Sequence, residues 1–152
     1  MNYWNQGILD RLVGREVRGI LMAEEALTFE TDREPVSYYV DGDCCSHSYF
    51  HDFYGVEKLL GSTVTAFESV DLSEGDPGWR KETWVEGAGH HDYEEIQVYG
   101  FRLTFEHPAF GDMSAVLSFR NASNGYYGGD MNATDTHLTD ETHRLTTDKI
   151  GE

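Results

Sequence analysis

The chain has little positive charge. Its 152 residues include only 11 Lys and Arg against 28 Asp and Glu, so its formal net charge is −17 at pH 7. A surface this negative repels the phosphate backbone of DNA and RNA. It repels anionic membranes for the same reason. The composition therefore predicts no direct partner among nucleic acids or membranes.

Cysteine is also scarce. The only two cysteines, Cys44 and Cys45, are neighbours, and a trans peptide resists the geometry that a disulfide between them would need. Two thiols without another partner are typical of a reducing compartment. No basic segment followed by an apolar run opens the chain, and no apolar stretch has the length of a membrane span. These features predict a cytoplasmic protein.

Aromatic residues, by contrast, are plentiful. Tyr, Phe and Trp number 9, 8 and 3, more than a disordered chain carries. We expect a single acidic α+β domain over residues 1–130, with a long loop at residues 71–94. Residues 131–152 are polar and are expected to form a tail or arm. This segment has three candidate roles: a flexible tail, an added edge strand, or an arm that orders on a partner.

Alternating apolar residues predict mostly β-structure. Short strands are expected near residues 17–22, 27–30 and 36–40. The turns between them are so short that neighbouring strands must be antiparallel. Residues 54–61 have the apolar spacing of one or two helical turns, and strand character resumes over residues 63–70.

Two longer patterns complete the expected fold. In the strand over residues 63–70, alternation places Val64 and Ala66 on one face and Phe67 on the other. Residues 99–105 and 113–119 form a long hairpin, expected at the centre of the sheet. The fold class is therefore α+β and mainly β. We expect an antiparallel sheet of about six strands, a meander plus a long hairpin, with one or two short helices.

The first dense polar segment follows the third expected strand. It can be a structural turn whose cysteines pack as small hydrophobic residues. It can supply a thiol nucleophile, Cys45, with His47 or His51 as base. It can also bind zinc, although adjacent cysteines rarely point at one ion, so we assign no metal and no cofactor. The residues expected to line a ligand site here are Asp43, Cys44, Cys45, Ser46 and His47.

The second dense segment has the sequence Asn-Gly-Tyr-Tyr-Gly-Gly. An Asn-Gly pair favours a tight hairpin turn, in which one tyrosine would pack against the body of the protein. Alternatively, the glycines expose backbone N–H groups and the tyrosines offer rings on which a planar ligand can stack. On that interpretation the ligand-binding residues are Asn124, Gly125, Tyr126, Tyr127 and Gly128.

Both segments take part in a family resemblance. The runs Gly42–Ser46, Val56–Gly61 and Asn121–Gly129 together resemble a family of small uncharacterised domains associated with tailed bacteriophages and actinobacterial genomes. The resemblance covers about residues 12–130, and Ala122 replaces the serine expected at that position. It implies a phage-encoded accessory protein that acts in the host cytoplasm. It carries over no catalytic residue.

Two classes of function follow. In the first, the chain is a non-enzymatic bacteriophage binding protein that counters host defence. It would sequester a small polar, nucleotide-like ligand or block a basic site on a host protein. In the second, it is a small hydrolase that uses a Cys/His or metal site around residues 43–51. We favour the first because no compact catalytic triad is visible. A homodimer is compatible with either class.

Overall fold

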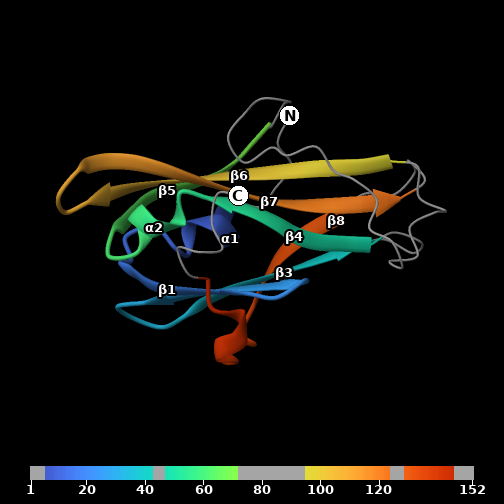
Figure 1. The fold of residues 1–152 in the computed structure, drawn as a ribbon, viewed down its shortest axis with the longest axis horizontal. Helices are drawn as coiled ribbons and strands as arrows, with labels where there is room; N and C mark the ends of the chain where they lie inside the picture. The colour runs from blue at the N-terminus through green and yellow to red at the C-terminus, as the bar shows by residue number, and fades with distance from the viewer. Residues whose placement is uncertain (1–5, 43–46, 72–94, 124–128, 146–152) are drawn as a thin grey trace.

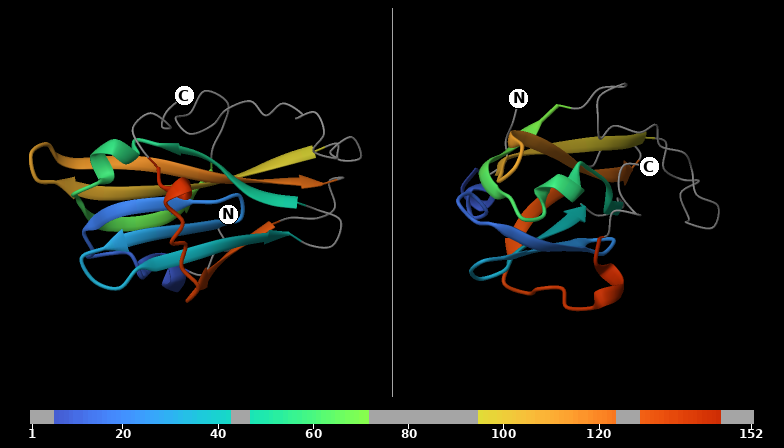
Figure 2. Two further views of the ribbon diagram at one scale, coloured as in Figure 1. Left: turned by 60° about the horizontal axis from the view of Figure 1, so that its bottom comes forward. Right: turned by 60° about the vertical axis from the view of Figure 1, so that its left-hand side comes forward.

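Two antiparallel sheets face each other in this computed structural model (Figures 1 and 2), which describes residues 6–42, 47–71, 95–123 and 129–145. Within these ranges, one sheet has the strand order β1-β2-β3-β8 and the other has the order β4-β7-β6-β5. The elements are α1 (Gln6–Asp10), β1 (Val17–Met22), β2 (Ala26–Thr31), β3 (Val36–Gly42), β4 (His47–Tyr54), α2 (Val56–Leu59), β5 (Thr63–Val70), β6 (Glu95–His107), β7 (Gly111–Ser123), β8 (Gly129–Thr134) and the short 3-10 helix η2 (Glu141–His143).

The mainly β composition is confirmed, and so are the elements with clear local signals. The three expected short strands are β1, β2 and β3, and the expected helical turns are α2. Gly61, just after α2, has a φ of 87°, which is the left-handed conformation that ends helices and suits glycine. The long hairpin is β6 and β7, and these strands lie at the centre of their sheet.

The expectation of one sheet with about six strands was wrong, because the described residues contain eight strands in two sheets. The chain changes sheets between β3 and β4 and again between β7 and β8. The pairing of β3 with β8 joins Val40 to Met131, far apart in the sequence. Local alternation cannot predict a pairing of this kind, because it is decided by how the two sheets cover each other.

In the described strands, β-bulges in β1, β4 and β5 disturb the alternation that the sequence suggests. In β5 a bulge between Val64 and Ala66 brings both Val64 and Phe67 into the core, which corrects their expected placement on opposite faces. In β4 an irregularity between Phe50 and Phe53 likewise buries both aromatic rings. An extra residue in one strand shifts the side-chain period by one, so β4 has no regular period-two signal.

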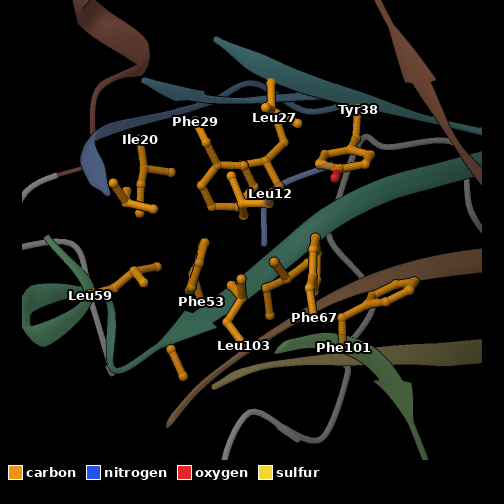
Figure 3. Packing of buried hydrophobic residues seen from close by; sticks show 14 of the residues in the cluster. Leu12, Ile20, Leu27, Phe29, Tyr38, Phe53, Leu59, Phe67, Phe101 and Leu103 are labelled. Atoms are coloured by element: carbon orange, nitrogen blue, oxygen red, sulfur yellow. The ribbon is translucent and has the colours of Figure 1, made fainter. Parts of the chain in front are cut away.

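The core lies between the sheets and is rich in aromatic rings (Figure 3). Phe29 makes edge-to-face contacts with Tyr38, Phe53 and Phe67, each at a centroid distance of 6.3 Å. These contacts join β2 and β3 of one sheet to β4 and β5 of the other. Such pairs stabilise a fold beyond their buried area.

The segment after residue 130 belongs to the body of the protein as far as residue 145. Residues 129–134 form β8, so the edge-strand alternative is the one observed for them. The chain then runs along the outer face of the β1-β2-β3-β8 sheet (Figure 1). There the Leu138 amide donates to Thr28 Oγ1 at 2.9 Å, and the Leu145 amide donates to the Ile20 carbonyl at 2.8 Å.

Candidate functional site

Strand pairing brings the flanks of both dense polar segments to one end of the sandwich. Gly42, the last residue of β3, pairs with Gly129, the first residue of β8. His47, the first residue of β4, pairs with Ala122 near the end of β7. Both segments therefore connect one sheet to the other at this end, which we call the crossover end, defined by Gly42, His47, Ser123 and Gly129 (Figure 1).

Gly129 allows the close packing of the crossover end. A Cβ atom at this position would clash with Ser48 Oγ and would lie 3.0 Å from Phe119 Cε1. Only glycine fits such a close approach without displacing a neighbour. The Gly129 amide donates to Tyr99 Oη at 3.3 Å, and the Tyr99 ring stacks on Phe119 with a centroid distance of 4.7 Å.

Buried polar side chains join β4 to β7 beside this glycine. Ser48 Oγ donates a hydrogen bond to Asn121 Oδ1 at 2.8 Å, and both residues are buried. A hydroxyl has one proton, so the longer contact of 3.2 Å from Ser48 to the Asp41 carbonyl is secondary. Buried polar pairs of this kind hold strand ends in one arrangement.

His47 lies between an aromatic ring and two carboxylates. Its ring stacks on Tyr49 with a centroid distance of 5.3 Å. Its Nε2 lies 3.4 Å from Glu24 Oε2, and its Nδ1 lies 3.9 Å from Glu25 Oε2. The turn that carries these carboxylates, between β1 and β2, is itself held to β4, because the Phe50 amide donates to the Glu24 carbonyl at 2.7 Å. Protonated His47 would form ion pairs with both glutamates.

Arg120 is a residue of this end that sequence reasoning missed. It lies on the face of β7 that is turned away from the core, because its neighbours Phe119 and Asn121 point inward, and yet its exposed fraction is 0%. Its Nη1 donates to Ser118 Oγ at 2.6 Å. The available signal was the one arginine in β7. A buried guanidinium requires compensating partners, and Ser118 is one of them.

Of the ten expected ligand-binding residues, His47 lies among the described residues. The other nine lie outside them: Asp43, Cys44, Cys45, Ser46, Asn124, Gly125, Tyr126, Tyr127 and Gly128. Among the described side chains, no group of three or more His, Cys, Asp and Glu residues is placed to hold a metal ion. The structure places the strand ends that flank the two segments at the same end of the sandwich, where Gly42 pairs with Gly129 and His47 pairs with Ala122.

Comparison with known proteins places the chain in a family. No curated protein and no solved structure matches it. No helix in the described part of the chain is long and apolar enough to cross a membrane. A family described as "Domain of unknown function (DUF7448)" matches residues 10–133, which include every strand except the last residue of β8. The chain therefore belongs to the DUF7448 family of domains of unknown function.

Proposed function

We propose that the chain is a non-enzymatic binding protein that holds a small polar, nucleotide-like ligand at the crossover end. One observation carries the proposal. The pairs Gly42–Gly129 and His47–Ala122 bracket the two segments richest in ligand-binding chemistry. Two segments that start from paired strand ends can contribute to a single site, as binding loops on a rigid sandwich do.

The residue types suit a planar ligand with polar edges. Tyrosine rings at positions 126 and 127 would stack on the ligand, and backbone N–H groups beside the glycines would donate to its edge. Thiol and hydroxyl groups at positions 44–46 would complete the contacts.

The biological setting that we propose is that of a bacteriophage accessory protein acting in the host cytoplasm. This part rests on the resemblance of the paired segments to phage-associated domains. A protein that sequesters a signalling nucleotide needs tight binding without turnover. It would oppose host defence by lowering the concentration of free ligand.

Native mass spectrometry tests the proposal. The protein is incubated with the low-molecular-mass extract of phage-challenged bacteria and measured before and after unfolding. We expect added mass of a small organic molecule that unfolding releases. Tyr126→Ala and Tyr127→Ala should lose the added mass, whereas Tyr54→Ala should keep it, since Tyr54 is exposed at the other end of β4. A protein that stays ligand-free contradicts sequestration.

The net charge of −17 supports a second candidate function, the blocking of a basic site on a host protein. Association through opposite charges weakens steeply as salt screens them. Pull-down from the same bacteria at low and high salt tests it, and a host protein retained equally at both would contradict it.

The hydrolase alternative makes a different prediction. Cys45→Ala would abolish turnover of the captured molecule while leaving its binding intact.

A further inference from the structure

A cleft of about 440 Å³ opens at the end of the sandwich opposite the crossover end. It lies where the chain leaves α1, where β3 begins and where β8 ends. Its walls include Arg11, Arg15, Ser37, Thr134 and His137. Ser37 pairs with Thr134 at the far end of the β3–β8 ladder from Gly42 and Gly129. The cleft is therefore separate from the crossover end.

The arginines of this acidic chain differ in whether they pair with carboxylates. Carboxylates outnumber Lys and Arg by 28 to 11. Three arginines, Arg18, Arg102 and Arg144, each lie within ion-pair distance of a glutamate, at 3.5, 3.4 and 2.6 Å. Arg11 and Arg15, in contrast, form no ion pair with any carboxylate in the described ranges, and neither does Arg33, which donates to the Gly14 carbonyl.

Arg15 is held in place without losing its charge. Its Nε donates to the Arg11 carbonyl and its Nη1 donates to the Glu34 carbonyl, both at 2.9 Å. A guanidinium has five N–H donors, so these two bonds orient the group and leave others for a ligand. A cation that is already oriented loses less entropy when it binds an anion.

A buried chain of hydrogen bonds fixes the opposite wall. Ser37 Oγ lies 2.6 Å from His137 Nδ1 and 2.7 Å from Thr28 Oγ1. Both hydroxyl residues are buried, and Thr28 also accepts from the Leu138 amide at 2.9 Å. The imidazole of His137 is thereby fixed against the sheet. The cleft has rigid polar walls on both sides.

Two exposed carboxylates, Glu34 and Asp135, also line the cleft. They form no described ion pair with the arginines. Their charge disfavours an extended polyanion such as a nucleic acid, because neighbouring phosphates would face them. A small ligand with a single anionic group, and a donor or positive group elsewhere, avoids that repulsion.

We propose that this cleft binds the carboxylate or phosphate group of a small molecule through Arg11 and Arg15. The guanidinium fork matches both groups geometrically. The inference goes beyond the proposed function, since it concerns a different end of the molecule. Anion binding in this cleft does not depend on whether a ligand occupies the crossover end.

Titration of the ¹⁵N-labelled protein followed by NMR tests the site, with inorganic phosphate and acetate as separate probes. We expect the Arg15 Nε–Hε resonance to shift and to saturate with at least one probe, and the tighter probe identifies the preferred class of anion. Arg11→Gln should weaken binding by about tenfold, as expected for loss of a charge-assisted hydrogen bond. Arg102→Gln removes the same charge elsewhere and should leave binding unchanged.

Two further variants are expected to strengthen binding, a result that misfolding cannot produce. Glu34→Gln and Asp135→Gln alter exposed side chains, and each should tighten binding because it removes a repelling charge. Shifts that grow linearly without saturating for both probes would overturn the proposal. So would equal losses of affinity in Arg11→Gln and Arg102→Gln, because binding would then follow net charge alone.

Discussion

Ser48 of β4 donates a buried hydrogen bond to Asn121 of β7 across 2.8 Å. The bond lies directly beside the point where both polar segments leave the sandwich, because His47 and Ala122 are the next pair in the register. A polar contact at this position holds together the strand ends on which the proposed ligand site depends.

Replacing Ser48 with alanine should destabilise the protein. The substitution removes the donor and leaves Asn121 Oδ1 without this partner in a buried position, at a cost of about 1–3 kcal/mol. The free energy of unfolding from urea denaturation measures the effect. Ser114→Ala is the matched control, since Ser114 is exposed on the same strand as Asn121, and it should change stability by less than about 0.5 kcal/mol. Equal effects of the two substitutions would contradict the structural role of Ser48.

Truncating Phe29 should cost far more than truncating Phe110. Phe29 is 0% exposed and contacts three aromatic rings, whereas Phe110 is 63% exposed on the β6–β7 turn. Phe29→Ala leaves a cavity between the sheets, and we expect a loss of about 3–5 kcal/mol. Phe110→Ala loses a surface contact with Lys58, worth about 1 kcal/mol or less.

If Phe29→Ala does not fold, Phe29→Leu provides the measurement. It keeps most of the apolar volume and should lose less stability than alanine while still exceeding the loss in Phe110→Ala. A Phe29→Leu protein as stable as wild type would show that these ring contacts do not stabilise the sandwich.

Tyr38 should make stability depend on alkaline pH. Burial raises the pKa of its hydroxyl above the ordinary value of 10.0, and the hydroxyl donates to the Ile8 carbonyl at 2.7 Å. Above the ordinary pKa, the unfolded chain releases a proton that the folded chain retains, so stability falls as pH rises. Urea denaturation between about pH 9 and about pH 11 measures the slope. Tyr38→Phe should show a shallower slope, and an unchanged slope would contradict this assignment.

Arg144 should determine how firmly residues 135–145 are held. Its guanidinium contacts Glu30 on β2 at 2.6 Å and Glu141 at 2.7 Å. Arg144→Gln should accelerate hydrogen exchange of the Leu145 amide, which donates to Ile20, by roughly two- to fivefold, since partly exposed ion pairs contribute little. Arg102→Gln breaks a partly exposed ion pair on the other sheet and should leave this amide unchanged.

The same contact should weaken in acid. The hydrogen bond from Arg144 holds the pKa of Glu141 below its ordinary value of 4.5. A lowered carboxyl pKa stabilises the folded state above the ordinary value, and this contribution is lost as pH falls through the lowered pKa. Protection of the Leu145 amide, corrected for intrinsic exchange, should therefore decrease below about pH 4.5 in wild type. It should decrease less in Glu141→Gln, which lacks the titrating group.

Local pattern predicted the strands β1, β2 and β3 and the hairpin of β6 and β7. It did not predict which side chains are buried in every strand, because a bulge interrupts β1 between Val17 and Gly19 and consecutive residues are buried in both β1 and β2. β4 was missed, because its bulge turns Phe50 and Phe53 to the same side. The position of a bulge depends on the pairing with the partner strand, so the sequence of β4 alone does not predict it.

The two candidate sites, like the strands, were predictable from the sequence only in part. The chemical character of the two polar segments was visible in the sequence, since cysteine, tyrosine, glycine and histidine gather there. Their common location was not, because it depends on the pairing of Gly42 with Gly129 and of His47 with Ala122. In the sequence, nothing distinguishes Arg11 and Arg15 from other surface arginines. The cleft that they line exists only because the chain brings them beside β3 and β8.

The amino-acid sequence by itself determined the acidic charge, the dominance of β-structure and the chemistry of each segment, because these follow from residue types and short-range periodicity. The tertiary structure alone decided the division into two sheets, the change of face within β4 and β5, and the juxtaposition of distant segments. These features depend on contacts between residues far apart in the chain, and the burial of two sheet faces against each other selects one arrangement among many that local preferences allow.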